Sequence, residues 1–159
     1  MLGSAALSVY TYADTGTSTM SVSALVGHSC SIDSNPMAFG AYDGVVANAS
    51  TALDAMATVV ATCTSGAAAL ITINAGASAG SGLADAPVRR MTAGAGEYLV
   101  YQVYSDVARS TVWGNSAPTG VALTGTGVSQ TLTAYGSVLP AQPAVQGMYS
   151  DQLIVTITY

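Results

Sequence analysis

Apolar residues recur at every second position in several short segments of this chain, and this spacing is the feature that most limits its fold. In residues 55–64, Ala57, Val59, Ala61 and Cys63 share one face, while the opposite face carries threonines. Successive side chains of a β-strand point to opposite sides of a sheet, so the pattern predicts a strand with one buried face. A helical period continues nowhere for more than about ten residues. The fold class is therefore predicted to be all-β.

Similar segments recur along the chain and are separated by glycine-rich stretches that predict turns. Strands are predicted at residues 17–26, 28–33, 55–64, 69–75, 89–91, 97–104, 128–134, 135–139 and 149–159. The composition agrees, because 17 valines, 5 isoleucines and 18 threonines among 159 residues favour strands over helices. Short strands at regular spacing predict one sandwich or barrel domain.

Charged side chains are scarce in this chain. It has three arginines, no lysine and eight acidic residues, which give a net charge of −5. A nucleic-acid partner requires cations against its phosphates, so the charge argues against that class of protein. The 50% share of hydrophobic residues argues against a disordered chain. No segment is long and apolar enough to predict a membrane span.

The N-terminal residues 1–13 carry no charge and end at Ala13. They resemble the second half of a secretory signal peptide that lacks its basic start, and we predict a signal-peptide remnant there. A strand-forming arm of the mature chain is the alternative. The predicted domain organisation continues with an N-terminal extension at 14–27 and one β-domain at 28–159.

Cys30 and Cys63 are the two thiols of the chain. There is no CxxC motif and a single histidine, so a four-ligand zinc site cannot be assembled at any usual spacing. Each cysteine falls on the apolar face of its predicted strand, and we predict a disulfide between them, as in secreted β-domains. The alternatives are two buried free thiols, or a catalytic cysteine with His28 as its base, for which no orienting partner is evident.

Residues of catalytic chemistry are few, with one histidine, one glutamate and seven aspartates. No GxSxG turn and no DxDxDG calcium loop occur. Asp106 and Arg109 are predicted to pair locally across a turn, and Arg89 and Arg90 to pair with Asp85 at a solvated strand end. We therefore predict no enzyme, and no catalytic, cofactor or metal site.

A set of short motifs in a fixed order gives the chain a family resemblance. These are MAFGAY at 37–42, VATCT at 60–64, INAG at 73–76, RRM at 89–91, LVYQVYSD at 99–106, WG at 113–114, YG at 135–136 and GMYSD at 147–151. With them, residues 20–159 resemble the spore coat protein U domain family, which includes pilus subunits of the archaic chaperone–usher pathway. The resemblance implies an incomplete immunoglobulin-like β-sandwich lacking its last strand. A neighbouring subunit's N-terminal extension would supply that strand in a fibre, and a periplasmic chaperone would supply it during secretion.

Two apolar faces agree with this implication. The predicted donor strand within the extension presents Met20, Val22, Ala24 and Val26. The chain ends in an apolar face that predicts the acceptor groove, Leu153, Val155, Ile157 and Tyr159. A sandwich that ends in this way leaves an edge exposed, and a strand added from another chain covers it.

The predicted function is a structural shaft subunit of a bacterial surface pilus, secreted through the periplasm and serving adhesion or biofilm formation. Its predicted partners are copies of itself, a periplasmic chaperone and an outer-membrane usher. A tip adhesin and a spore-coat protein of the same family are alternatives, although a tip subunit is expected to carry a further receptor-binding domain. A secreted carbohydrate-binding module, using Trp113 and the tyrosines of 97–104, is a third. A secreted hydrolase ranks last, because a catalytic set is missing.

Overall fold

The computed structural model describes residue 9, residues 11–94 and residues 96–159. In this range the chain forms eight β-strands and one short 3-10 helix, η1 (Ala117–Thr119). The strands are β1 (Cys30–Ser34), β2 (Leu53–Cys63), β3 (Ala68–Ile73), β4 (Arg89–Gly94), β5 (Glu97–Tyr104), β6 (Val121–Thr124), β7 (Ser129–Val138) and β8 (Val155–Thr158). The predicted all-β class is confirmed.

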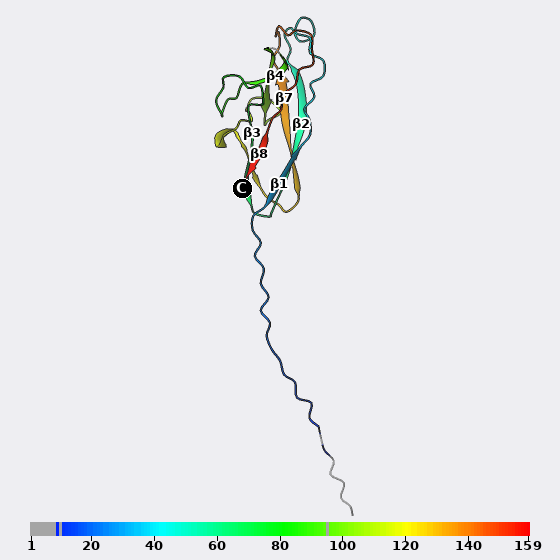
Figure 1. The fold of residues 1–159 in the computed structure, drawn as a ribbon, viewed down its shortest axis with the longest axis vertical. Helices are drawn as coiled ribbons and strands as arrows, with labels where there is room; N and C mark the ends of the chain where they lie inside the picture. Colours follow the sequence, from blue (N-terminus) through cyan, green and yellow to red (C-terminus); the bar gives the residue numbers. More distant parts are fainter. Residues whose placement is uncertain (1–8, 10, 95) are drawn as a thin grey trace, which may run out of the picture.

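Two antiparallel sheets form a β-sandwich. The larger sheet has the strand order β1-β2-β7-β5-β4, and the smaller has the order β6-β3-β8. Edge strand β1 of the larger sheet and edge strand β8 of the smaller sheet lie close together near the pole where the N-terminal segment leaves the body (Figure 1). This arrangement places two strand edges on the same side of the sandwich.

The core between the sheets follows the predicted alternation. In β2, Val59, Ala61 and Cys63 are buried, while the residues between them are more exposed. Trp113 is fully buried, and its indole N–H donates to the carbonyl of Ile71 at 2.8 Å, which satisfies the one polar atom of the ring. Complete burial of an aliphatic or aromatic side chain of this kind stabilises the fold by about 1.5–3 kcal/mol.

The segment around Gly136 differs from the prediction. Two strands were expected at 128–134 and 135–139, but β7 runs without interruption from Ser129 to Val138. Gly136 lies inside this strand, and a Cβ there would collide with Met37 and Phe39, whose side chains lie over β7. Strand β6 also lies inside the glycine-rich stretch 114–127, where only turns were expected.

The predicted strand at 17–26 is absent from the single chain. Residues 11–29 have no secondary structure, are exposed, and leave the body as an extended tail (Figure 1). Nothing in the described part of the chain pairs with residues 17–26, and an unpaired segment cannot form a ladder. The signal-peptide prediction at 1–13 falls mostly outside the described residues.

The predicted pairing of Arg89 and Arg90 with Asp85 is wrong. Arg89 is fully buried, and Arg90 stacks its guanidinium on the Tyr98 ring at 3.9 Å from the centroid. Asp85 instead accepts a hydrogen bond from the hydroxyl of Ser116. The local sequence at the start of β4 does not indicate that the Arg89 side chain is buried.

The predicted pairing of Asp106 with Arg109 is also wrong. Asp106 caps its own loop by accepting the N–H groups of Thr111 and Ser110, and these bonds lower the pKa of its carboxyl group. Arg109 reaches across to β2 and pairs with Asp54 at 3.2 Å.

Candidate functional site

A cavity of about 420 Å³ opens between the two sheets, on the side where β1 and β8 form their edges. One wall is the segment that continues β1, residues 34–39, and the other is the segment that leads into β8. Its floor is the inner face of the larger sheet, including Val59, Tyr101 and Val103. The core of the sandwich is therefore accessible along this edge.

The backbone of both edge strands is free to pair along this opening. The N–H of Asn35 donates to Thr58, so alternate residues of β1 face β2, and Cys30, Ile32 and Ser34 turn their backbone groups toward the open edge. The N–H of Asn74 donates to Ile154, and the same alternation turns the backbone of β8 residues Val155 and Ile157 outward. One further strand between β1 and β8 would satisfy both edges.

Two of the four residues predicted for the acceptor groove line this cavity. Leu153 and Val155 line the cavity directly. Ile157 is half-buried and packs against a small cluster around Cys63, where β1 and β8 lie close together. Tyr159 is 56% exposed, at the end of the chain beyond β8.

Several lining residues were not predicted as part of the groove. Met37 and Phe39 come from the MAFGAY motif, and Met91 and Tyr149 come from two further motifs of the family resemblance. The fixed order of these motifs along the chain was the one feature of the sequence that pointed to these residues. Their position over one groove depends on the loop that joins β1 to β2, which no local pattern predicts.

The tail residues predicted as donors are all exposed in the single chain. Met20 is 88% exposed, Val22 88% and Val26 78%, and Ala24 lies between them on the same face of an extended segment. Large apolar side chains are rarely left so exposed in succession unless another molecule covers them.

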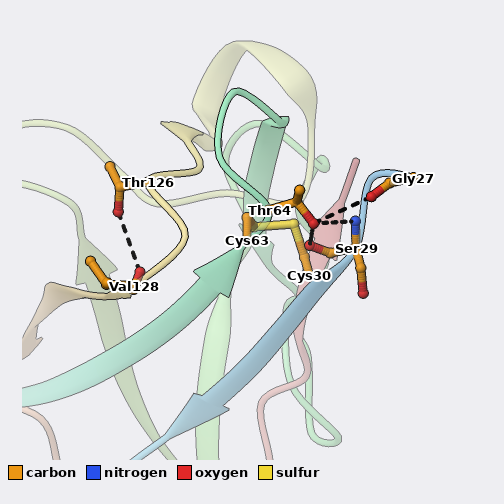
Figure 2. Close-up of a disulfide and its surroundings, with 7 residues drawn as sticks. All are labelled: Gly27, Ser29, Cys30, Cys63, Thr64, Thr126 and Val128. Carbon is orange, nitrogen blue, oxygen red and sulfur yellow. Dashed lines mark hydrogen bonds between the residues drawn. A yellow bond between two sulfur atoms is a disulfide. The ribbon is translucent and has the colours of Figure 1, made fainter. Parts of the chain in front are cut away.

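A disulfide between Cys30 and Cys63 fixes the point where the tail joins the body (Figure 2). The two residues face each other across β1 and β2. Beside them the Thr64 hydroxyl accepts the N–H of Ser29 at 3.1 Å and lies 3.4 Å from the carbonyl of Gly27. The root of the tail is thus held both covalently and by hydrogen bonds.

Replacing both cysteines by alanine should destabilise the subunit. The bridge closes a loop with a sequence separation of 33, for which loop entropy gives about 3–4 kcal/mol. Urea unfolding would measure the loss, and Ser31→Ala, an exposed change on the same strand, is the control. A loss below about 1 kcal/mol would show that the bridge adds little to stability.

Polar residues close one end of the cavity, where Tyr101 and Asp151 line it. Tyr101 donates its hydroxyl proton to Asp151 at 2.7 Å, and the other oxygen of Asp151 accepts the N–H of Ala77 at 2.9 Å. Burial and the bond to Asp151 raise the pKa of Tyr101, so its hydroxyl stays protonated. This end of the cavity is therefore a hydrogen-bonded network that joins Tyr101, Asp151 and the backbone of Ala77.

The described residues contain neither a candidate metal site nor a candidate membrane-spanning helix. No group of three or more histidine, cysteine, aspartate or glutamate side chains is placed to hold a metal ion. No helix in the same residues is long and apolar enough to cross a membrane.

Residues 16–156 match the spore coat protein U domain. The chain belongs to the spore coat protein U domain family. The chain is similar in sequence to Protein U of Myxococcus xanthus. The two are 36% identical over 155 residues, which cover 92% of this chain and 87% of that protein.

A solved structure shares the fold of this spore coat protein U domain. It is the complex of a chaperone with the tip adhesion subunit of the archaic chaperone–usher Csu pili of Acinetobacter baumannii, with a TM-score of 0.60 and 16% identity. The match covers 84% of this chain and 40% of the solved one. The sandwich of this family member therefore has the fold of a chaperone–usher pilus subunit.

Proposed function

We propose that this protein is a structural subunit of a bacterial surface fibre, assembled by donor-strand complementation, with no enzymatic role. In each contact, Met20, Val22, Ala24 and Val26 of one copy fill the groove beside Leu153 and Val155 of the next. A periplasmic chaperone covers the groove before assembly, and an outer-membrane usher exports the subunit. At the cell surface the fibre serves adhesion or biofilm formation.

One observation carries the proposal: the same chain has an open core flanked by two unpaired strand edges and an unpaired tail with apolar residues at a period of two. The tail supplies what the groove lacks, namely a strand with one apolar face. Its serines, Ser21 and Ser23, would face solvent, because a strand places alternate side chains on opposite sides.

A synthetic peptide of residues 15–29 should stabilise the isolated subunit. Without a donor strand we expect the subunit to aggregate, polymerise or stay bound to a chaperone. At a hundredfold excess over its dissociation constant, a ligand specific for the folded state adds about 2.7 kcal/mol of stability. Thermal unfolding of the subunit released from its chaperone would measure this gain. A cooperative monomer transition that the peptide leaves unchanged would contradict the proposed function.

A spore-coat role is the second candidate, and the 36% identity to Protein U of Myxococcus xanthus favours it. It would use the same groove and the same tail, so only the place of assembly differs. Genes for a chaperone and an usher beside this one would favour the pilus, and labelling of the protein on spores would favour the coat.

The aromatic residues on which the carbohydrate-binding alternative depends are mostly not accessible to a sugar. Trp113 is 0% exposed and Tyr101 4% exposed, whereas sugar binding by stacking requires an exposed aromatic face. The Tyr98 ring is partly exposed, but Arg90 covers it.

A further inference from the structure

A second cavity, of about 900 Å³, lies at the pole of the sandwich opposite the root of the tail. We call it the pole pocket. Its walls are residues 37–45 and 142–149, and its floor includes Leu53, Leu99 and Val138. It is continuous with the groove, because Met37, Phe39, Met91 and Tyr149 line both cavities.

The walls of the pole pocket are held by specific hydrogen bonds. The hydroxyl of Tyr42 donates to the carbonyl of Leu139 at 2.9 Å and accepts the N–H of Gln142 at 2.9 Å. The side-chain amide of Gln142 binds both the N–H and the carbonyl of Val100 on β5. The pocket is therefore a built feature of the fold.

The rim of the pole pocket is strongly apolar and exposed. Met148 is 87% exposed, Val45 85%, Val46 78% and Val145 51%. The lining contains a single charged residue, Asp43, whose carboxylate already accepts the N–H groups of Val45 and Val46. An apolar rim of this kind favours an uncharged protein surface as its partner.

The length of the tail limits which surface can reach this pocket. Four steps of extended chain separate Val26 from Cys30, and at about 3.4 Å each they span about 14 Å. A subunit whose Val26 is seated in a neighbour's groove must therefore lie against the end of that groove. Only the direction of the donor strand decides which end that is.

The direction follows from the crowding at the tail pole. If the donor ran parallel to β8, its body would lie at the pole where the acceptor's own tail and C-terminus leave the sandwich (Figure 1). If it runs antiparallel to β8, its body lies over the pole pocket, where no tail interferes. The copies then stack head to tail, with the tail pole of one over the pole pocket of the next.

We propose that the pole pocket is a second contact between adjacent copies, and that it receives the tail pole of the donor subunit. The occupant is the surface around Gly27, Ser29 and Val128 of the second copy, and Val128 is 65% exposed there (Figure 2). This inference rests on the proposed function, and it adds a body-to-body interface to the donor strand.

Cysteine cross-linking in assembled fibres tests this contact. Met148→Cys and Val128→Cys are combined in one chain, since both side chains are exposed and their replacement leaves the core intact. After mild oxidation and denaturation without reductant, we expect most subunits in a covalent ladder that a reductant collapses to monomers. The yield should be the same at 50 mM and 500 mM salt, because the contact is uncharged.

The matched control combines Val128→Cys with Met56→Cys, because Met56 is 64% exposed and lies on the outer face of β2, whereas Leu53 of the same strand faces the pole pocket. It should give at most a fifth of the ladder yield. An equal yield in this control, or fibres without a ladder in the test variant, would overturn the pole contact and leave donor-strand assembly standing. Failure of the unaltered chain to form any fibre would overturn the proposed function and this inference with it.

A third variant separates a copy of the chain from a chaperone as the occupant. Met148→Asp should leave recovery of the chaperone-bound subunit unchanged and slow fibre growth at least threefold. If it instead abolishes recovery of the chaperone-bound subunit, the pocket belongs to the chaperone and the proposal is wrong.

Discussion

Val22→Asp should abolish fibre assembly while leaving the folded, chaperone-bound subunit unchanged. Val22 is 88% exposed in the single chain, so the substitution does not disturb the sandwich. In the fibre the new carboxylate would enter an apolar core, where no cation lies among the residues that line the groove. Loss of the valine contributes about 1.5–3 kcal/mol, and burial of an unpaired charge adds several more. Electron microscopy of chaperone-released subunits would count the fibres.

Ser23→Asp is the matched control for this variant. It introduces the same charge one residue away, on the face of the donor strand that points to solvent. Its fibres should assemble at a rate within a few-fold of the unaltered chain. If Val22→Asp assembles as well as Ser23→Asp, residues 17–26 are not the donor strand, and the alternation of Leu7, Val9 and Thr11 becomes the next candidate.

Arg89→Met should cause the largest loss of stability of any single substitution in the body. The guanidinium is fully buried and donates to the carbonyls of Ile73, Asn74 and Trp113 and to the side chain of Gln102. Burial lowers the pKa of Arg89 to about 10, so the group remains charged at neutral pH. Methionine replaces the stem but leaves these buried acceptors without donors, at a cost of about 3–5 kcal/mol.

Urea unfolding of the subunit complemented by the 15–29 peptide would measure this loss. Arg90→Met is the control, because Arg90 is only partly buried and bonds to the exposed loop carbonyls of Ser78 and Ala79. It should cost about 1 kcal/mol. Equal losses in the two variants would show that burial of the Arg89 network does not dominate.

The strands that sequence analysis located are those whose two faces differ in polarity. Strands β2, β3 and β8 overlap the predicted segments 55–64, 69–75 and 149–159, because alternation reports burial directly. The single strand β7 was predicted as two strands, and the role of Gly136 inside it, making room for Met37 and Phe39, depends on a loop distant in sequence. Segment 17–26 has the pattern of a strand but no partner among the residues that the structure describes, so the pattern alone could not place it.

Some parts of the candidate site could be predicted from periodic patterns in the sequence, and other parts could not. The apolar faces of the tail and of residues 153–157 were visible as periodic patterns. The pole pocket was not, because loops more than ninety residues apart form it, and Tyr42 and Gln142 bring them together. Arg89 was misplaced because carbonyl groups surround it, and backbone acceptors leave no trace in a sequence.

The position of the disulfide has a mechanical consequence for a fibre linked through the tails. Tension on such a fibre enters each subunit at Ser29 and reaches Cys30, which is bonded to Cys63 at the end of β2. The load therefore bypasses the five-residue edge strand β1. It is applied along the axis of β2, which is paired with β7 at ten positions. Pulled along its axis, this ladder resists in shear, with all its hydrogen bonds loaded together. Without the bridge, β1 would carry the load alone and could be pulled from the edge of the sheet.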